Sequence, residues 1–213
     1  MIRKLKALGL VVVAVLAMSA IGASAAQAIT LSSSSYPQTV EGSGTEIGEH
    51  FLTEAGKVEC HLSKYTGTLS EASPTLRVTP IYETCKAFGF LNATVNTNGC
   101  HYLFHATEHD SSTNTYTAHV DVECTDGKVI EITSGTCKVS VGSQTGLTTV
   151  DITNMAVSPP DLTVRPTVKG IAYTVTQDGF GCPFTGTGAK TGGEYTSTGY
   201  ITVTAAGGLT VST

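Results

Sequence analysis

The sequence contains no tryptophan, and only 14% of its residues are charged. It has no close-set cysteine pair such as C-x-x-C, which excludes the common structural zinc motifs. It also has no G-x-S-x-G, so the nucleophile elbow of serine hydrolases is absent. The absence of tryptophan disfavours a surface on which sugars stack. No motif therefore points to an activity, and we expect no catalytic residue and no cofactor.

Long hydrophobic runs are also rare, and the one that exists lies at the start of the chain. Residues 1–28 combine a basic start, the apolar run ALGLVVVAVLAMSAIG and the small residues ASAAQA, which is typical of a signal peptide. We predict a signal-peptide helix with cleavage after Ala28, or alternatively after Ala25. The apolar run is shorter than the ~20 residues of a spanning helix, so we expect no membrane association after cleavage.

The charge is sparse and acidic. Cleavage after Ala28 removes three of the 12 basic residues and none of the 17 acidic ones, which takes the net charge from −5 to −8. Such a domain gains little from a phosphate backbone or an anionic lipid surface, so we do not expect nucleic acid as a partner. The expected partner is an extracellular or cell-envelope ligand. The sequence leaves its identity and the oligomeric state open.

Six cysteines in an exported chain predict disulfides. Two bridges follow from hairpin symmetry, because their midpoints fall in the turn-forming stretches SEASPT and EHDSSTN. The third bridge follows by elimination. The predicted pairs are Cys60–Cys85, Cys100–Cys124 and Cys137–Cys182.

Short alternating runs rich in threonine and valine fill the rest of the chain, separated by turn dipeptides such as NG, DG, SG and GG. This pattern is typical of antiparallel strands. We predict an all-β fold, an antiparallel β-sandwich or a partly open barrel of about 10–13 short strands. After the signal peptide no segment has apolar residues at helical spacing.

Composition also suggests the domain organisation. Residues 29–48 are rich in serine and glycine, and we expect a flexible lead-in there. Residues 49–213 are predicted to form a single β-sandwich domain. The proline pair in SPPD makes a division near Ser158 the alternative.

The most unusual stretch runs from Cys100 to Cys124 and holds four of the six histidines. If these cysteines face each other across a hairpin, Tyr102, Phe104, Val120 and Val122 share one side, because side chains alternate along a strand. We predict that this apolar side faces the core.

The other side of the same hairpin is polar and carries His101 and Glu123 besides its central residues. His105 lies opposite His119 with Asp121 diagonal to them, which allows a metal site with two histidines and one acid. A structural zinc site usually has four protein ligands, and no fourth is evident. We therefore expect the solvated face of a sheet and no metal here. The same register places Thr107 opposite Thr117.

Several phrases of the chain resemble a group of uncharacterised exported proteins from soil actinobacteria. The phrases are EAGKVEC, YETCKAFGF, NGCHYLFH, VDVEC, SQTGL and KGIAYTVT. The resemblance implies export and a cysteine-containing all-β fold over most of the mature chain. It implies no activity and no site residues.

We therefore expect a secreted, non-enzymatic module of the extracellular space or cell envelope, with a binding or structural role. The alternative is a small secreted hydrolase or a metal-binding protein that uses His105, His119 and Asp121. A concave site over these residues would favour the enzyme, and a flat sheet would favour the module.

Overall fold

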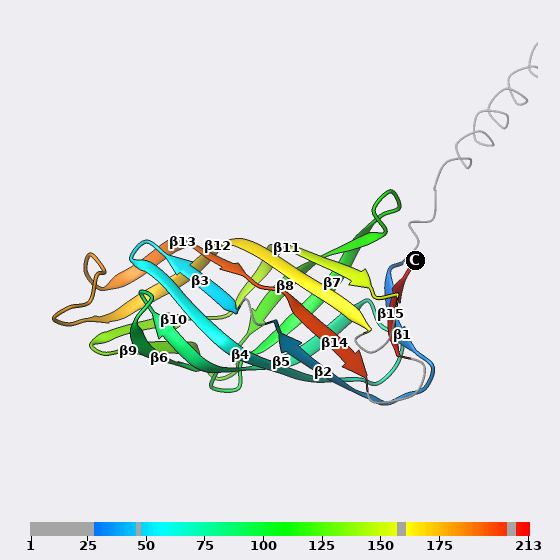
Figure 1. Ribbon diagram of the computed structural model, residues 1–213, viewed down its shortest axis with the longest axis horizontal. Coiled ribbons are helices and arrows are strands. Elements are labelled where there is room, and N and C mark those ends of the chain that lie inside the picture. The colour runs from blue at the N-terminus through cyan, green and yellow to red at the C-terminus, as the bar shows by residue number, and fades with distance from the viewer. Residues whose placement is uncertain (1–27, 46–47, 157–160, 204–207) are drawn as a thin grey trace, which may run out of the picture.

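The computed structural model describes residues 28–45, 48–156, 161–203 and 208–213. Apart from Ala28, the predicted signal peptide lies outside the described residues. Within them, every regular element is a β-strand, and no helix is long and apolar enough to cross a membrane. Figure 1 shows an elongated arrangement of these strands. They are β1 (Thr30–Ser33), β2 (Gln38–Gly44), β3 (Glu49–Thr53), β4 (Gly56–Leu69), β5 (Thr75–Ala87), β6 (Leu91–Asn96), β7 (His101–Asp110), β8 (Thr115–Glu123), β9 (Ile130–Ser134), β10 (Cys137–Val141), β11 (Gln144–Asn154), β12 (Leu162–Asp178), β13 (Gly188–Thr196), β14 (Gly199–Val203) and β15 (Leu209–Ser212).

Thirteen strands form one antiparallel sheet, in the order β10-β9-β6-β5-β7-β8-β11-β12-β13-β3-β4-β2-β14. Consecutive short strands continue one another: β2 and β3 both pair with one edge of β4, and β13 and β14 both pair with one edge of β12. Counted in this way, the long strands are β2+β3, β4, β5, β6+β7, β8+β9, β10+β11, β12 and β13+β14.

These long strands follow each other in chain order, and each pairs with the next. The first and last also pair, through β3 with β13 and β2 with β14, so the sheet closes into a ring. The all-β antiparallel fold is thus confirmed. The sequence predicts a β-sandwich or a partly open barrel, and the strands form a partly ring-closed sheet, which corresponds to the second of these arrangements.

The segment 29–48, expected to be a flexible lead-in, instead contributes two strands. In β2 the side chains of Gln38 and Val40 are buried while Thr39 and Glu41 are exposed, which is the alternation of a strand that covers a core. The serine and glycine residues of segment 29–48 make this alternation hard to recognise in the sequence. The alternative division near Ser158 lies outside the described residues, and β11 and β12 on either side of it pair with each other.

Three disulfides staple neighbouring strands, and they join the pairs that the sequence predicts. Cys60–Cys85 links β4 to β5, Cys100–Cys124 closes the hairpin of β7 and β8, and Cys137–Cys182 ties β10 to the connection after β12. Disulfides form and persist in oxidising compartments, so they indicate an extracellular type of environment.

The β7–β8 hairpin has the predicted register from His101 to Ala106, and Val120 and Val122 are buried. Tyr102 and Phe104 pack against the core from the same side. The predicted pairing of Thr107 with Thr117 is wrong, because a β-bulge sets Glu108 opposite Thr117. A bulge inserts one residue into one strand and shifts the register beyond it.

A two-stranded ribbon of β1 and β15 lies at one end of the ring (Figure 1). Leu31, Leu209 and Val211 are almost fully buried there. The Asn154 side-chain amide donates to the Val211 carbonyl at 2.8 Å and accepts from the Val211 N–H at 2.9 Å. The Asn154 side chain thus takes the place of a neighbouring strand's backbone beside β15. The ribbon therefore covers this end of the apolar interior.

Candidate functional site

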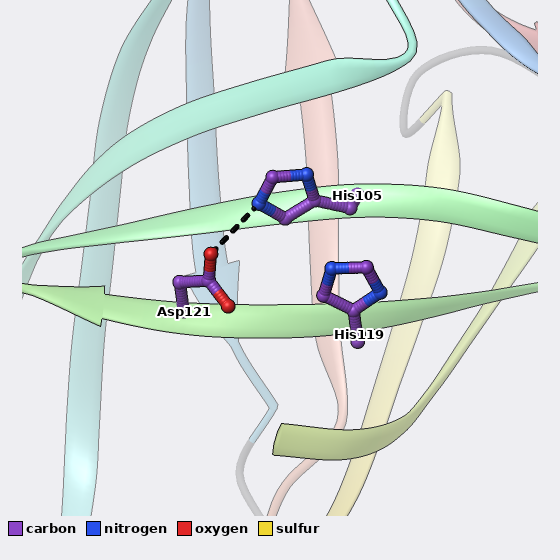
Figure 2. A group of neighbouring side chains, drawn as sticks. All are labelled: His105, His119 and Asp121. Carbon is purple, nitrogen blue, oxygen red and sulfur yellow. Dashed lines mark hydrogen bonds and ion pairs between the residues drawn. The ribbon is translucent and has the colours of Figure 1, made fainter. Parts of the chain in front are cut away.

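The first candidate site lies on the outer side of the β7–β8 hairpin, where alternation collects polar side chains. Figure 2 shows that His105 of β7 and His119 and Asp121 of β8 meet there. We call these three residues the histidine cluster. All three are partly exposed, as the sequence predicts for the solvated side of this hairpin.

The histidine cluster is held by a hydrogen bond and a ring stack. His105 Nε2 lies 3.0 Å from Asp121 Oδ2, and the imidazoles of His105 and His119 stack with centroids 4.4 Å apart and planes 14° from parallel. Asp121 Oδ1 accepts the Gly146 N–H at 2.7 Å, which fixes the carboxylate. One ligand atom from each member lies within 4.8 Å of the others, a spacing that suits one metal ion.

Other polar residues of the hairpin form separate local contacts. His101 Nδ1 lies 2.9 Å from Thr79 Oγ1, and Glu123 Oε2 lies 2.7 Å from a guanidinium nitrogen of Arg77. His109 lies beyond the bulge, which brings it to the inner side of the hairpin, where it stacks on the buried Tyr116. The polar face is thus a series of local pairs, of which only the histidine cluster brings three ligands together among the described residues.

The second candidate site lies inside the ring and was not predicted. Its centre is Glu49, the first residue of β3, which is only 3% exposed. The alternation of EHFLT gives the signal, because Glu49 shares its side with the buried Phe51 and Thr53.

Four tyrosines converge on Glu49, and with it they form what we call the interior cluster: Glu49, Tyr65, Tyr82, Tyr102 and Tyr195. The Tyr195 hydroxyl donates to Glu49 Oε2. It also lies 3.1 Å from the Tyr65 hydroxyl and 3.4 Å from the Tyr82 hydroxyl, and Tyr82 lies 2.8 Å from Tyr102. A phenol has one proton, so with Tyr195 donating to the carboxylate, its tyrosine neighbours donate toward it.

The backbone around Glu49 makes room for the carboxylate. Ser63 Oγ donates to Glu49 Oε1 at 2.6 Å. A Cβ atom at Gly44 would lie 2.3 Å from Ser63 Oγ and 2.6 Å from Glu49 Oε1, distances at which something must shift. The absence of a side chain at position 44 is therefore part of how the ring holds an acid in its interior.

Burial keeps the tyrosines of the interior cluster protonated. It raises the pKa of Tyr102 to about 12, with a further contribution from the negative charge of Glu49. Burial also raises the pKa of Tyr65, Tyr82 and Tyr195 well above the usual value for a phenol, and nearby tyrosines and Glu49 add to the effect. At physiological pH these four groups are neutral hydrogen-bond donors.

The interior cluster forms part of the wall of a cavity of about 100 Å³, which we call the main cavity. Most of its lining is aliphatic or aromatic, and Glu49 is the one acidic or basic side chain among the lining residues. A second cavity of about 60 Å³ lies on the other side of Tyr102, Phe104 and Tyr195, which line both. Tyr102, Phe104 and Tyr195 are partly buried, and part of the surface that they leave accessible faces the two cavities.

No protein-family model, curated protein or solved structure matches the chain. The geometry and chemistry of the two sites are therefore the basis on which a function is proposed.

Proposed function

We propose that the protein is a secreted, non-enzymatic binding module that holds a small, largely apolar ligand inside its ring of strands. The observation that carries this proposal is the main cavity, about 100 Å³ of space bounded by apolar side chains and one polar cluster. The interior of an eight-stranded ring is just wide enough for its own side chains or for one small ligand. Apolar space with a few convergent polar groups is the usual composition of a ligand site.

Export belongs to the same proposal. The predicted signal peptide and the resemblance to exported actinobacterial proteins support release from the cell, and three disulfides suit an oxidising surrounding. The proposal includes the more specific location of the protein in the cell envelope.

A secreted hydrolase that uses the histidine cluster receives less support. A hydrolase needs its reacting groups in a concave site that surrounds the substrate. The cavities described here are lined by other residues, and the histidine cluster lies on the outer side of the sheet.

Xenon binding tests the proposal, because xenon enters dry apolar cavities. We expect saturable shifts of the methyl NMR signals that line the main cavity in the wild type. Val168→Leu adds one methylene to the wall of this cavity and should weaken the shifts. Val139→Leu adds the same group to a buried position outside the main cavity and should preserve them. Absence of saturable shifts in the wild type would contradict the proposal.

Metal binding at the histidine cluster is the second candidate function, favoured by three ligand atoms within 4.8 Å. We rank it second because the lone pairs of stacked imidazoles lie in nearly parallel planes and do not point at one ion. For one ion to bind both histidines, at least one imidazole ring must rotate and the hydrogen bond between His105 and Asp121 must break.

Zinc titration of protein purified without a histidine tag separates the two candidates. Stoichiometric, sub-micromolar binding that is lost in His105→Ala/His119→Ala would establish the metal site. His61→Ala is the matched control, since His61 also lies beside a carboxylate, 3.5 Å from Glu59, but outside the cluster. Equal zinc affinity in all three proteins would eliminate this candidate.

A further inference from the structure

The buried carboxylate of Glu49 bears on the chemistry of the ligand. We infer that the main cavity takes a small organic ammonium ion, whose charged nitrogen meets Glu49 and whose apolar body fills the rest of the space. This inference rests on the proposed function and names the class of ligand.

The first step is the uncompensated charge of the site. No lysine, arginine or histidine belongs to the residues that line the main cavity. Glu49 is held by two neutral donors, Ser63 and Tyr195. A buried carboxylate without a cationic partner costs free energy, and a cation from outside would offset that cost.

The second step is the remaining hydrogen-bonding capacity. A carboxylate has about four lone-pair sites, and the protein supplies one donor to each oxygen of Glu49. Acceptor capacity is left for the N–H groups of an ammonium ion. The tyrosines stay neutral, so no second anion competes for the ligand, and aromatic faces attract organic cations.

The third step is that Glu49 sits in a built site rather than at an accidental contact. Gly44 leaves the space for its carboxylate, Ser63 and Tyr195 orient it, and Tyr65, Tyr82 and Tyr102 extend the network. Such an arrangement pre-organises the acid, so that binding needs little rearrangement of the protein.

The volume limits the size of the ligand. A cavity of about 150 Å³ holds benzene, with its six heavy atoms. By the same scale, the main cavity of about 100 Å³ suits a body of about four or five heavy atoms. Isobutylammonium has this size, and isobutanol is its neutral counterpart of the same shape.

The test compares the two probes by calorimetry, with NMR contacts from the probe methyl groups to Val120 and Val122 locating the site. We expect isobutylammonium to bind the wild type with 1:1 stoichiometry and more tightly than isobutanol. Glu49→Gln should weaken the ammonium about 10- to 100-fold, since hydrogen bonds to charged groups are the strong ones. Glu41→Gln removes the same charge from an exposed position of β2 and should change nothing.

The outcomes separate the inference from the proposed function. Equal binding of both probes to the wild type and to Glu49→Gln would overturn the inference and leave the cavity as a binding site. Binding of neither probe, together with no xenon binding, would overturn both. If Glu49→Gln does not fold, the comparison of ammonium and alcohol on the wild type still decides.

Discussion

At the scale of single residues, Glu49 is the feature to which the interior is adapted. Ser63 and Tyr195 donate to its two oxygens, and a glycine at position 44 leaves the carboxylate its space. A well-packed apolar side chain often stabilises a core as well as or better than a buried ion does. A role in binding therefore explains the acid better than a role in folding.

Gly44→Ala should destabilise the protein by about 1 to 3 kcal/mol, because a new Cβ would overlap Ser63 Oγ and Glu49 Oε1. Urea unfolding measures the change. In a double-mutant cycle, Gly44→Ala should cost less in a Ser63→Ala background than in the wild type, because one of the overlapping atoms is then absent. Gly142→Ala is the control, since its Cβ would meet only Val129 at 3.9 Å. Equal losses in the two glycine variants would show that the space at Gly44 has no special role.

The raised pKa of Tyr102 predicts a loss of stability in alkaline solution. Its folded-state pKa of about 12 lies above the usual value of 10.0, so the unfolded chain releases this proton first. The free energy of unfolding is fully retained below pH 10 and falls as the pH rises toward 12. Two pKa units correspond to about 3 kcal/mol from this one residue.

Urea unfolding of the wild type at pH 8 and pH 11 measures this fall, and Tyr102→Phe supplies the comparison. The variant lacks the titrating group and should lose less stability between the two pH values. The same fall in both proteins would assign the alkaline effect to other residues.

At the scale of elements, the β7–β8 hairpin shows how far sequence patterns reach. Two cysteines and the alternation between them predict the register from His101 to Ala106, the inward apolar side and the position of the histidine cluster. They do not predict the bulge after Ala106, because no residue type there distinguishes it. The inward Glu49 is not predicted because its signal is short: only Phe51 and Thr53 share its side of β3.

The two sides of this hairpin should respond differently to truncation. Phe104 lines both cavities from the inner side, so Phe104→Ala should cost about 3 to 5 kcal/mol of unfolding free energy and merge the two spaces. His101 lies on the outer side and has one hydrogen bond, to Thr79, so His101→Ala should cost about 1 kcal/mol or less. Urea unfolding gives both values, and a larger loss for His101→Ala would mean that the sides are assigned the wrong way round.

At the scale of the whole molecule, ring closure depends on contacts that the sequence does not mark. Each hairpin is local, and Ser134-Gly135, with a positive φ at Gly135, turns the β9–β10 hairpin. Asn98-Gly99 and Asp126-Gly127 instead lie at breaks inside long strands, between β6 and β7 and between β8 and β9. The pairing of β3 with β13 joins segments far apart in the chain. A sandwich and a ring share the same alternation along each strand, so only this long-range pairing distinguishes them.

The three disulfides should together decide whether the whole ring stays folded. They span 25, 24 and 45 residues, and these loops do not overlap along the chain. Each bridge therefore restricts a different part of the unfolded chain. Loop-closure entropy gives about 3.5 to 4 kcal/mol for each bridge. Their sum, about 11 kcal/mol, matches the entire stability of a typical domain, about 5 to 15 kcal/mol.

We therefore expect full reduction to unfold the protein at 37 °C, as seen by loss of its β-sheet circular dichroism. Cys137→Ala/Cys182→Ala keeps two bridges and should remain folded, with a lower urea midpoint than the wild type. Because the loops are separate, the losses from removing single bridges should add. A reduced protein with an unchanged urea midpoint would show that packing inside the ring suffices, and that the oxidising compartment is not needed for the fold.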